Sequence, residues 1–479
     1  MFKNALRTAR AFFSIIALFN CLSFLSIAEN SKDEKLNVIV IMADDLGYHD
    51  LSFQGSKHIK TPHIDKLARE GVFFTDGHTT ASVCSPSRAG FMTGRYQQRF
   101  GHEANCPRGK YGMALDEYTA GQAFQSQGYK TFILGKWHLG NMSKQHPTHR
   151  GFDEFWGLRE GSRGYFYNKK NDNPNSHHAI EHNETHVHFE GFLTDRITDK
   201  AIEMVKSAGQ QPFFMFLSYT APHGPLQAKK EDLAKANGDP YVALVQNMDG
   251  NIGRFIAFLE KTKVKENTII WFLSDNGGTV NNASNFPLNG KKGILFEGGM
   301  RVPLILNHPK KSSFSTYDKT VSTLDILPSS LSMAGLKVDF PKPLDGKDLT
   351  PYLFEGKKEA PHSVLFWRKL EMKSIRKQNW KLILSEGLPP MLYDINKDLS
   401  ERHNKAEERP ELVSQLSEQL KEWEGELQAP LWKEDKYHDY LRKCSYVRFR
   451  DAKDFIPLES SGVKKKAKKE AQNAKKLSN

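Results

Sequence analysis

Two pairs of oxygen-bearing side chains stand directly after apolar stretches that lie far apart in the chain. Asp44 and Asp45 follow one β-branched run, and Asp275 and Asn276 follow another. Such runs predict buried parallel strands, and open α/β sheets collect ligands at the carboxyl ends of their strands. The four side chains offer only oxygen ligands, which suit a hard cation such as Ca²⁺ or Mg²⁺. The sequence therefore predicts a metal site, although a single Asp-Asp pair is usually a turn or a helix cap.

A dense motif, CSPSRAGFMTGR, begins at Cys84. Pro86 in the first turn and the residues after Arg88 predict a short helix. Cys84 would lie at the positive end of that helix, where backbone N–H groups favour an anion. The alternative is a buried core cysteine, which a lone cysteine usually is.

Three further motifs carry groups that could bind anions or transfer protons. Lys136 and His138 are two residues apart in GKWHLG, so both can point the same way from a strand end. His223 lies close to two prolines in APHGP, where it could equally be a rigid loop residue. Lys292 stands five residues before Glu297 in GKKGILFEGGMR.

The pattern Cys-x-Pro-x-Arg from Cys84 to Arg88, together with the motifs above, resembles the formylglycine-dependent (type I) sulfatases of the alkaline phosphatase superfamily. The resemblance implies that a maturation enzyme oxidises Cys84 to an aldehyde, 3-oxoalanine or formylglycine. A hydrated aldehyde carries two hydroxyls on one carbon. One would attack sulfur, and the other, once deprotonated, would expel sulfate. A serine hydroxyl would instead be left as a stable ester.

The resemblance also implies the metal and its ligands. The family binds calcium most often, so we expect one Ca²⁺ ion per chain. Its expected ligands are Asp44, Asp45, Asp275, Asn276 and the modified Cys84.

Roles for the remaining residues follow from the same resemblance. Arg88 and Lys136 would stabilise the charge of the aldehyde or the sulfate, and His138 would act as the base that collapses the sulfated hydrate. His223 would contact the leaving oxygen. Lys292 would neutralise the bridging oxygen or protonate the leaving alcohol, with the lysine just before it as the alternative.

Apolar strands and amphipathic helices alternate as far as residue 355, which predicts an α/β domain with a large, mainly parallel sheet covered by helices on both faces. The resemblance implies an alkaline-phosphatase-like arrangement of this sheet. We expect strands at 37–42, 72–74, 131–134, 213–219 and 268–273, and helices at 61–70, 121–127, 195–208 and 241–261. Later strands at 362–368, 373–377, 380–385 and 391–395, with a helix at 410–426, predict a smaller antiparallel sheet. The expected division is a catalytic domain at 29–355 and a C-terminal subdomain at 356–460.

The two ends of the chain carry most of its net charge of +12. Three basic residues and then an apolar run ending at Ala28 predict a signal peptide over 1–28 and an exported protein, periplasmic or secreted. A retained membrane anchor is the alternative, which Asn20 and Ser23 within the run disfavour. The Lys-rich stretch 461–479 predicts a disordered tail. We therefore expect no nucleic-acid partner and no stable membrane insertion.

Cysteines outside the leader and the Cys84 motif are few. Cys106 and Cys444 could form a disulfide in an oxidising compartment or remain free thiols.

The segment 159–191 is the most irregular part of the chain and bears on the substrate. Its Tyr165, Phe166 and Tyr167 could stack on sugar rings, whereas its five histidines fit no closed zinc site. Further candidates for recognising a charged glycan are Arg99, His102, Glu103, Trp367 and Arg368. Because several segments also look like those of glycan sulfatases, we expect a sulfated oligo- or polysaccharide such as ulvan, carrageenan or a glycosaminoglycan.

Two other functions remain open at this stage. A phosphonate or phosphodiester hydrolase of the same superfamily can share the Cys-x-Pro-x-Arg element, and it would turn over phosphate diesters faster than aryl sulfates. A non-catalytic sulfoglycan-binding protein would keep the thiol of Cys84.

Overall fold

A computed structural model describes residues 35–450 except 108, 170–171, 175, 177, 280–281, 312–313 and 435. The described residues from Asn37 onward belong to one compact unit, and the fold given below is that of this unit. The predicted leader at 1–28 and tail at 461–479 lie outside the described residues and stay predictions, as do the predicted domain boundaries. Within the described residues, no helix combines the length and apolar character that a membrane crossing requires.

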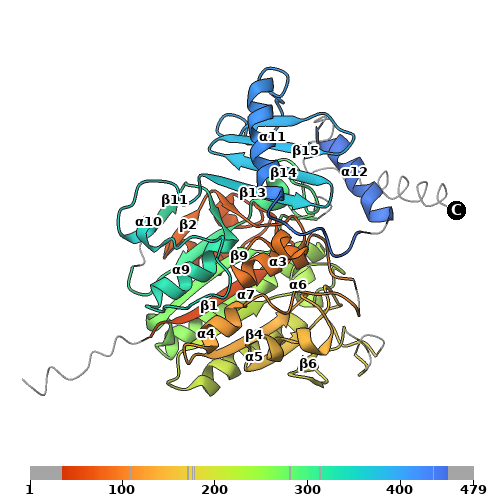
Figure 1. Ribbon diagram of the computed structural model, residues 1–479. Coiled ribbons are helices and arrows are strands. Elements are labelled where there is room, and N and C mark those ends of the chain that lie inside the picture. Colours follow the sequence, from red (N-terminus) through yellow and green to blue (C-terminus); the bar gives the residue numbers. More distant parts are fainter. Residues whose placement is uncertain are drawn as a thin grey trace, which may run out of the picture. The chain divides into compact units, whose positions relative to one another are not determined.

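A ten-stranded mixed sheet forms the centre of the unit (Figure 1). Its strands, in spatial order, are β11 (Ser315–Tyr317), β2 (Val72–Phe74), β10 (Leu304–Asn307), β9 (Thr268–Ser274), β1 (Asn37–Ala43), β8 (Phe213–Ser218), β4 (Lys130–Lys136), β5 (Glu154–Leu158), β6 (Glu181–His182) and β7 (Thr185–His186). β1 pairs in parallel with β8 and β9, and β4 pairs in parallel with β8 and β5. β10 runs antiparallel to β9 and β2. The predicted sheet is therefore confirmed, because its central strands are the apolar runs that can be buried on both faces.

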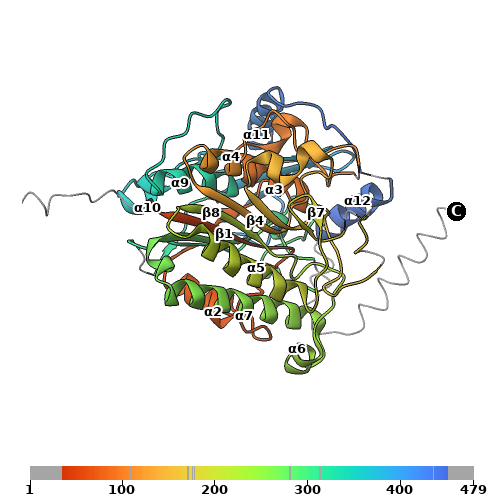
Figure 2. The ribbon, with the colours of Figure 1, turned by 90° about the horizontal axis from the view of Figure 1, so that it is seen from below.

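Helices cover both faces of the sheet, as Figure 2 shows, with α2, α5 and α7 on one face and α3, α4 and α9 on the other. These helices are α2 (Pro62–Arg69), α3 (Cys84–Thr93), α4 (Ala120–Gln125), α5 (Leu193–Ala208), α7 (Pro240–Lys261) and α9 (Ile326–Met333). The four predicted helices are confirmed to within a few residues. Thr61, the residue before α2, makes no side-chain capping bond to the helix main chain, because its hydroxyl donates to the Asp65 carboxylate at 2.9 Å.

The core on one face of the sheet fixes where the central strands end. All seven residues of β1 are buried, and Ile39 and Ile41 pack in one cluster with Leu244 and Met248 of α7. Alternate residues of a strand face opposite sides, so both faces of β1 are held. Whatever follows β1 therefore starts from a rigid position.

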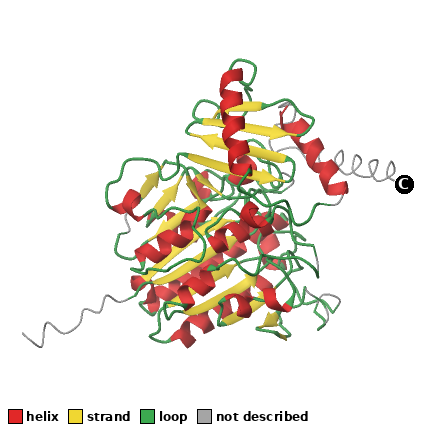
Figure 3. Cartoon of the chain, in the orientation of Figure 1, coloured by secondary structure: helices red, strands yellow, loops and turns green. Residues whose placement is uncertain are grey.

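A separate four-stranded antiparallel sheet follows, with a helix across it (Figure 3). It consists of β13 (Val364–Lys369), β14 (Met372–Lys377), β15 (Trp380–Ser385), β16 (Met391–Asp394) and α11 (Pro410–Glu424). Leu416 and Leu420 of α11 are buried in one cluster with Ile375 and Leu382 of the sheet. This part of the fold prediction is confirmed. The sequence did not predict α12 (Lys436–Arg450).

A buried ionic cluster joins this sheet to the short helix α8 (Glu297–Met300). The Glu297 carboxylate lies 2.9 Å from Lys381 Nζ and 3.0 Å from His78 Nε2. Arg301 and Arg376 lie within 3.5 Å of the same carboxylate. Asp76, His78 and Glu297 could form a metal-binding group by their positions. The three basic side chains around them, Lys381, Arg301 and Arg376, already balance the negative charge of the carboxylates. The cluster is therefore explained as an ion-pair network that holds the second sheet to α8, and we call it the ionic joint.

Candidate active site

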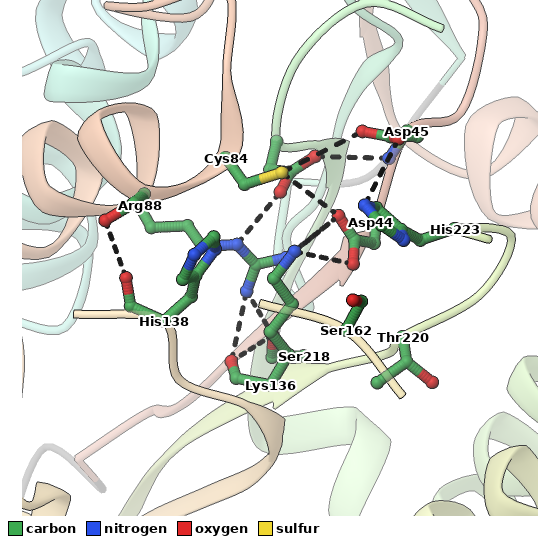
Figure 4. A network of polar contacts seen from close by, with 12 residues as sticks. Asp44, Asp45, Cys84, Arg88, Lys136, His138, Ser162, Ser218, Thr220 and His223 are labelled. Atoms are coloured by element: carbon green, nitrogen blue, oxygen red, sulfur yellow. Dashed lines mark hydrogen bonds and ion pairs between the residues drawn. The ribbon is translucent and has the colours of Figure 1, made fainter. Parts of the chain in front are cut away.

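The ends of β1 and β9 bring the predicted oxygen-bearing residues together, of which Figure 4 labels Asp44 and Asp45. The main-chain N–H of Asp45 donates to Asp275 Oδ1 at 3.2 Å, and the N–H of Asp275 donates to the carbonyl of Ala43 at 3.1 Å. The N–H of Asp44 donates to the carbonyl of Ala221, two residues before His223. These hydrogen bonds connect the loops that follow β1, β8 and β9 at the carboxyl ends of the strands, as their positions after strands predicted.

Cys84 is the first residue of α3, and it is buried in the middle of these loops. Its Sγ lies 2.9 Å from Lys292 Nζ, 3.7 Å from Asp44 Oδ1 and 4.0 Å from Asp45 Oδ1. Burial alone would raise the pKa of this thiol, but the positive charges of Lys136 and Lys292 lower it to about 6. The position therefore favours an anionic group at residue 84.

Two cations, Lys136 and Arg88, pair with carboxylates of this cluster. Lys136 Nζ donates to both oxygens of Asp44 at 2.8 and 2.9 Å. Arg88 donates through Nε to Asp275 at 2.9 Å and through Nη1 to the Ser218 hydroxyl at 2.6 Å. Ser218 in turn donates to the carbonyl of Lys136 at 2.8 Å. The sequence analysis missed Ser218, although its place at the end of β8 was the signal that could have found it.

The donor set fits a divalent cation. One ligand atom each from Asp44, Asp45, Cys84 and His223 lie within 4.8 Å of one another. Asn276 donates its amide N–H to Asp45 at 2.8 Å, while its buried Oδ1 has no hydrogen-bond partner among the described residues. Burial raises the pKa of Asp44 to about 8, even against the opposing charge of Lys136. A bound cation would offset this cost of burying carboxylates and would use the unpartnered amide oxygen.

The two histidines of the site have opposite protonation preferences. His223 Nε2 lies 3.6 Å from Asp45 Oδ2. Burial disfavours its charged form, but the neighbouring Asp44 and Asp45 raise its pKa to about 9. Burial and the charges of Lys136 and Arg88 hold the pKa of His138 well below its usual value. At neutral pH the site therefore offers one protonated and one neutral imidazole, which is how an acid and a base are set apart.

The motif that carries Lys136 and His138 depends on an unusual backbone. His138 has φ +60° and Asp45 has φ +69°, a region that side-chain-bearing residues seldom adopt. Gly135 opens the motif with φ +89°, and a Cβ there would lie 1.8 Å from the carbonyl oxygen of Ser218. Only glycine allows β4 to approach β8 so closely at the site.

Every residue predicted for catalysis or metal binding is thus placed in one cluster, whereas most of the side chains expected to contact a glycan are paired or buried. Arg99 is paired with Asp345 at 2.8 Å and Glu426 at 2.9 Å. Glu103 is paired with Arg368 at 2.6 Å. The charges of these three side chains are thus paired within the protein, and their predicted contacts with a glycan stay predictions.

The aromatic candidates and His102 include both buried and exposed side chains. Trp367 is buried and donates to the Thr79 carbonyl at 2.7 Å, and His102 is buried against Ser85, so neither faces a ligand. Tyr165 is also buried, and its hydroxyl donates to the main chain of the His223 loop at 2.8 Å. Phe166 and Tyr167 remain exposed.

The remaining open points concern cysteines and histidines. Cys106 and Cys444 are both free, so the alternative of a disulfide does not apply. Of the five histidines, His177 lies outside the described residues. None of the other four belongs to a metal-binding group among the described residues.

Comparisons with known proteins agree with this geometry. The sequence model of the Sulfatase family matches residues 36–336, and that of the C-terminal part of N-sulphoglucosamine sulphohydrolase matches 290–426. The chain is 31% identical to N-acetylgalactosamine-6-sulfatase of Rattus norvegicus, over 71% of this chain and 70% of that protein. It is 32% identical to the uncharacterized sulfatase YdeN of Escherichia coli (strain K12), with the same coverage. The solved structure of Ps i-CgsB in complex with k-i-k-neocarrahexaose is 34% identical, with a TM-score of 0.79, over 87% of this chain and 99% of that one.

Proposed function

This chain belongs to the sulfatase family and is a sulfuric ester hydrolase, and from that premise we propose that it removes sulfate from a sulfated glycan outside the cytoplasm. We further propose that it does so with formylglycine made from Cys84 by a maturation enzyme and with one bound Ca²⁺ ion. The observation that carries the proposal is the surroundings of Cys84. A buried side chain at a helix start contacts Lys292 and stands beside Asp44 and Asp45.

Both proposed groups fit the residues that surround them. Formylglycine hydrate would supply one hydroxyl that attacks sulfur and a second that releases sulfate, so that a difficult displacement becomes two easier steps. A divalent cation held by Asp44, Asp45, Asp275 and Asn276 would withdraw charge from a sulfate oxygen.

The cations of the chain favour an anionic substrate at this point. Arg88, Lys136 and Lys292 already balance three buried carboxylates, so an added divalent cation leaves an excess of positive charge. A sulfate monoester, which carries one negative charge, offsets part of that excess. Lys292 lies 2.9 Å from the side chain of residue 84, where it donates to the group at that position as negative charge develops.

Proton transfer is divided between the two histidines. His223 is charged at neutral pH, so it donates a proton to the leaving alcohol oxygen. His138 is neutral, so it accepts the proton that must leave residue 84 when sulfate is expelled. The opposite assignment would require each imidazole to act from its minor protonation state.

A sulfated sugar is the proposed substrate class for three reasons. The related Ps i-CgsB is solved with k-i-k-neocarrahexaose, and another relative is an N-acetylgalactosamine-6-sulfatase. Phe166 and Tyr167 are exposed by 40% and 38%, which leaves aromatic faces able to stack on sugar rings. The third reason is the proposed export of the protein, which the leader predicted at 1–28 implies.

Sulfate release from a panel of defined substrates tests the proposal. The panel contains sulfated galactan and glycosaminoglycan oligosaccharides, an aryl sulfate and a phosphate diester, and the protein is co-expressed with a maturation enzyme. We expect release from at least one sulfated oligosaccharide and an aldehyde mass for the Cys84 peptide. Faster hydrolysis of the phosphate diester, or active protein that retains the thiol, would refute it.

A further inference from the structure

The backbone of His138 is held by a hydroxyl that belongs to the helix of residue 84. His138 is buried with φ +60°, and its N–H donates to the Arg159 carbonyl at 3.1 Å. Its carbonyl oxygen accepts the hydroxyl hydrogen of Ser85 at 2.7 Å. A residue without glycine's freedom keeps this conformation only where its surroundings fix it.

The orientation of the Ser85 hydroxyl is determined by its partners. The single hydroxyl hydrogen goes to the His138 carbonyl, because that oxygen can only accept. His102 Nε2, 2.7 Å from Ser85 Oγ, must therefore be the protonated nitrogen of its ring and donate. Cys106 Sγ, at 3.1 Å, donates its weak S–H to the same oxygen. All the hydrogen-bonding capacity of Ser85 Oγ is then used.

The three partners are themselves kept in the states that this arrangement needs. Burial lowers the pKa of His102 to about 3 and raises that of Cys106 to about 12, so the ring is neutral and the thiol keeps its proton. The edge of Trp432 packs against His102 with ring centres 4.8 Å apart, and its indole N–H donates to the Asn105 carbonyl at 2.9 Å. The Asn105 side chain accepts the main-chain N–H of Ser85 at 3.1 Å.

We propose that Ser85 is a positioning residue, whose hydroxyl fixes the main chain of His138 and so sets the imidazole relative to the side chain of residue 84. The inference rests on the proposed function, in which His138 acts as the base. Ser85 directly follows Cys84. Its hydrogen bond therefore connects the first turn of the helix that carries residue 84 directly to the main-chain carbonyl of His138. A loss of this bond leaves a buried carbonyl unpaired and releases the strained peptide at His138.

A matched set of variants separates positioning from packing. Ser85→Thr keeps the hydroxyl, Ser85→Val has the same shape without it, and Ser85→Ala tests its removal without added bulk. Ser87→Ala is the control, because Ser87 is equally buried in the same helix and makes no side-chain hydrogen bond to the His138 segment among the described residues. Mass spectrometry of the Cys84 peptide gives the matured fraction, and kcat is expressed per matured site.

We expect Ser85→Ala and Ser85→Val to lower kcat by about 10²-fold, the effect of misplacing a reacting group by about 1 Å, with KM close to wild type. Ser85→Thr should recover most of the lost kcat, and Ser87→Ala should behave as wild type. Equal kcat for Ser85→Thr and Ser85→Val, or wild-type kcat for Ser85→Ala, would overturn the inference.

A crystal structure of Ser85→Ala gives an answer that does not depend on activity. We expect the His138 peptide to leave the left-handed region, and an unchanged φ at His138 would refute the positioning role. If wild-type protein hydrolyses no sulfate ester, the proposed function fails, while this structural comparison still decides whether Ser85 holds His138.

Discussion

Replacing Lys292 by glutamine removes the positive charge closest to the side chain of residue 84. Lys292 Nζ lies 2.9 Å from Cys84 Sγ and 2.6 Å from Asp45 Oδ1, and the pKa of Lys292 is held well above its usual value despite burial. Glutamine keeps most of the length and a hydrogen-bond donor. The change therefore tests the charge more than the packing.

The size of the effect follows from these distances. Two unit charges 2.9 Å apart interact by about 6 kcal/mol at an effective dielectric constant of about 20. Part of this is already offset, because the ammonium is buried and shared with Asp45. Removal of one buried donor to developing charge typically lowers kcat by about 10²–10³-fold, or about 2.7–4 kcal/mol. We expect Lys292→Gln to fall in that range with KM changed much less.

The matched control is Lys291→Gln, which also settles the choice between the two adjacent lysines. Burial and then the charge of Arg448 lower the pKa of Lys291, and no hydrogen bond joins it to Cys84 among the described residues. We expect its kcat to stay within a few-fold of wild type. A larger loss in Lys291→Gln than in Lys292→Gln would refute the assignment.

A second measurement needs no turnover and uses protein produced without the maturation enzyme. Thiolate absorbance is followed against pH, with Cys84→Ser protein subtracted. The wild-type Cys84 thiol is expected to titrate with a pKa of about 6. In Lys292→Gln its pKa should rise toward the ordinary value of a thiol, and an unchanged pKa would contradict the electrostatic argument.

Four further predictions concern the nucleophile, the metal, the acid and the ionic joint. Cys84→Ser should lose multiple turnover, because a sulfated serine has no second hydroxyl with which to expel sulfate, and wild-type steady-state rates would contradict this. Asp275→Ala should purify without the calcium that we expect in wild type, whereas Asp50→Asn, a buried acid outside the cluster, should keep it by elemental analysis. His223→Asn should impair hydrolysis of sugar sulfates more than that of aryl sulfates with acidic phenols. The wild-type kcat/KM should fall as the pH rises through the raised pKa of His223, where the imidazole loses its proton, and His223→Asn should lack this limb. Glu297→Gln should destabilise the fold by about 3–5 kcal/mol in denaturant unfolding, because it leaves Lys381 and two arginines without their shared carboxylate.

The fold was predictable where the burial of an element requires a recognisable pattern of apolar residues in the sequence. β1 and β9 are buried on both faces, so their apolar runs gave their positions to within a residue or two. The antiparallel strands were not predictable in the same way. β6 and β7 are two-residue strands of polar composition, and β10 is a short apolar segment whose direction depends on its partner β9.

Site residues that directly follow strands could be predicted from the sequence, whereas the ion-pair partners of other charged residues could not. Asp44 and Asp275 were recognised because they follow strands, and strand ends share an edge. From the sequence, Arg99, Glu103 and Arg368 are candidates for contacting a glycan, because the sequence does not show whether a charged side chain faces water or an internal partner. Their partners are over 200 residues away in the chain, at Asp345 for Arg99 and within the pair Glu103–Arg368.

The protonation states of His138 and His223 are a consequence of the same long-range order. Both follow apolar strands, and of the charged groups that separate the acid from the base only Lys136 is a neighbour in the sequence. His138 stands among Lys136 and Arg88, while His223 faces Asp44 and Asp45, and only this difference moves their pKa values apart. The charge of each imidazole is therefore a property of the assembled site.

The position of Lys292 links the site to the second sheet, which the sequence treats as a separate subdomain. Tyr446 of α12 accepts the main-chain N–H of Leu295 at 2.6 Å, and Glu401 accepts that of Glu297 at 2.7 Å. Lys381 of β15 binds both Glu297 and Glu401 at 2.8–2.9 Å. These bonds fix the segment just after Lys292 from its C-terminal side. Residues beyond 355 thus hold a cation against the side chain of residue 84, so the reaction depends on the second sheet even though no predicted catalytic residue lies in it.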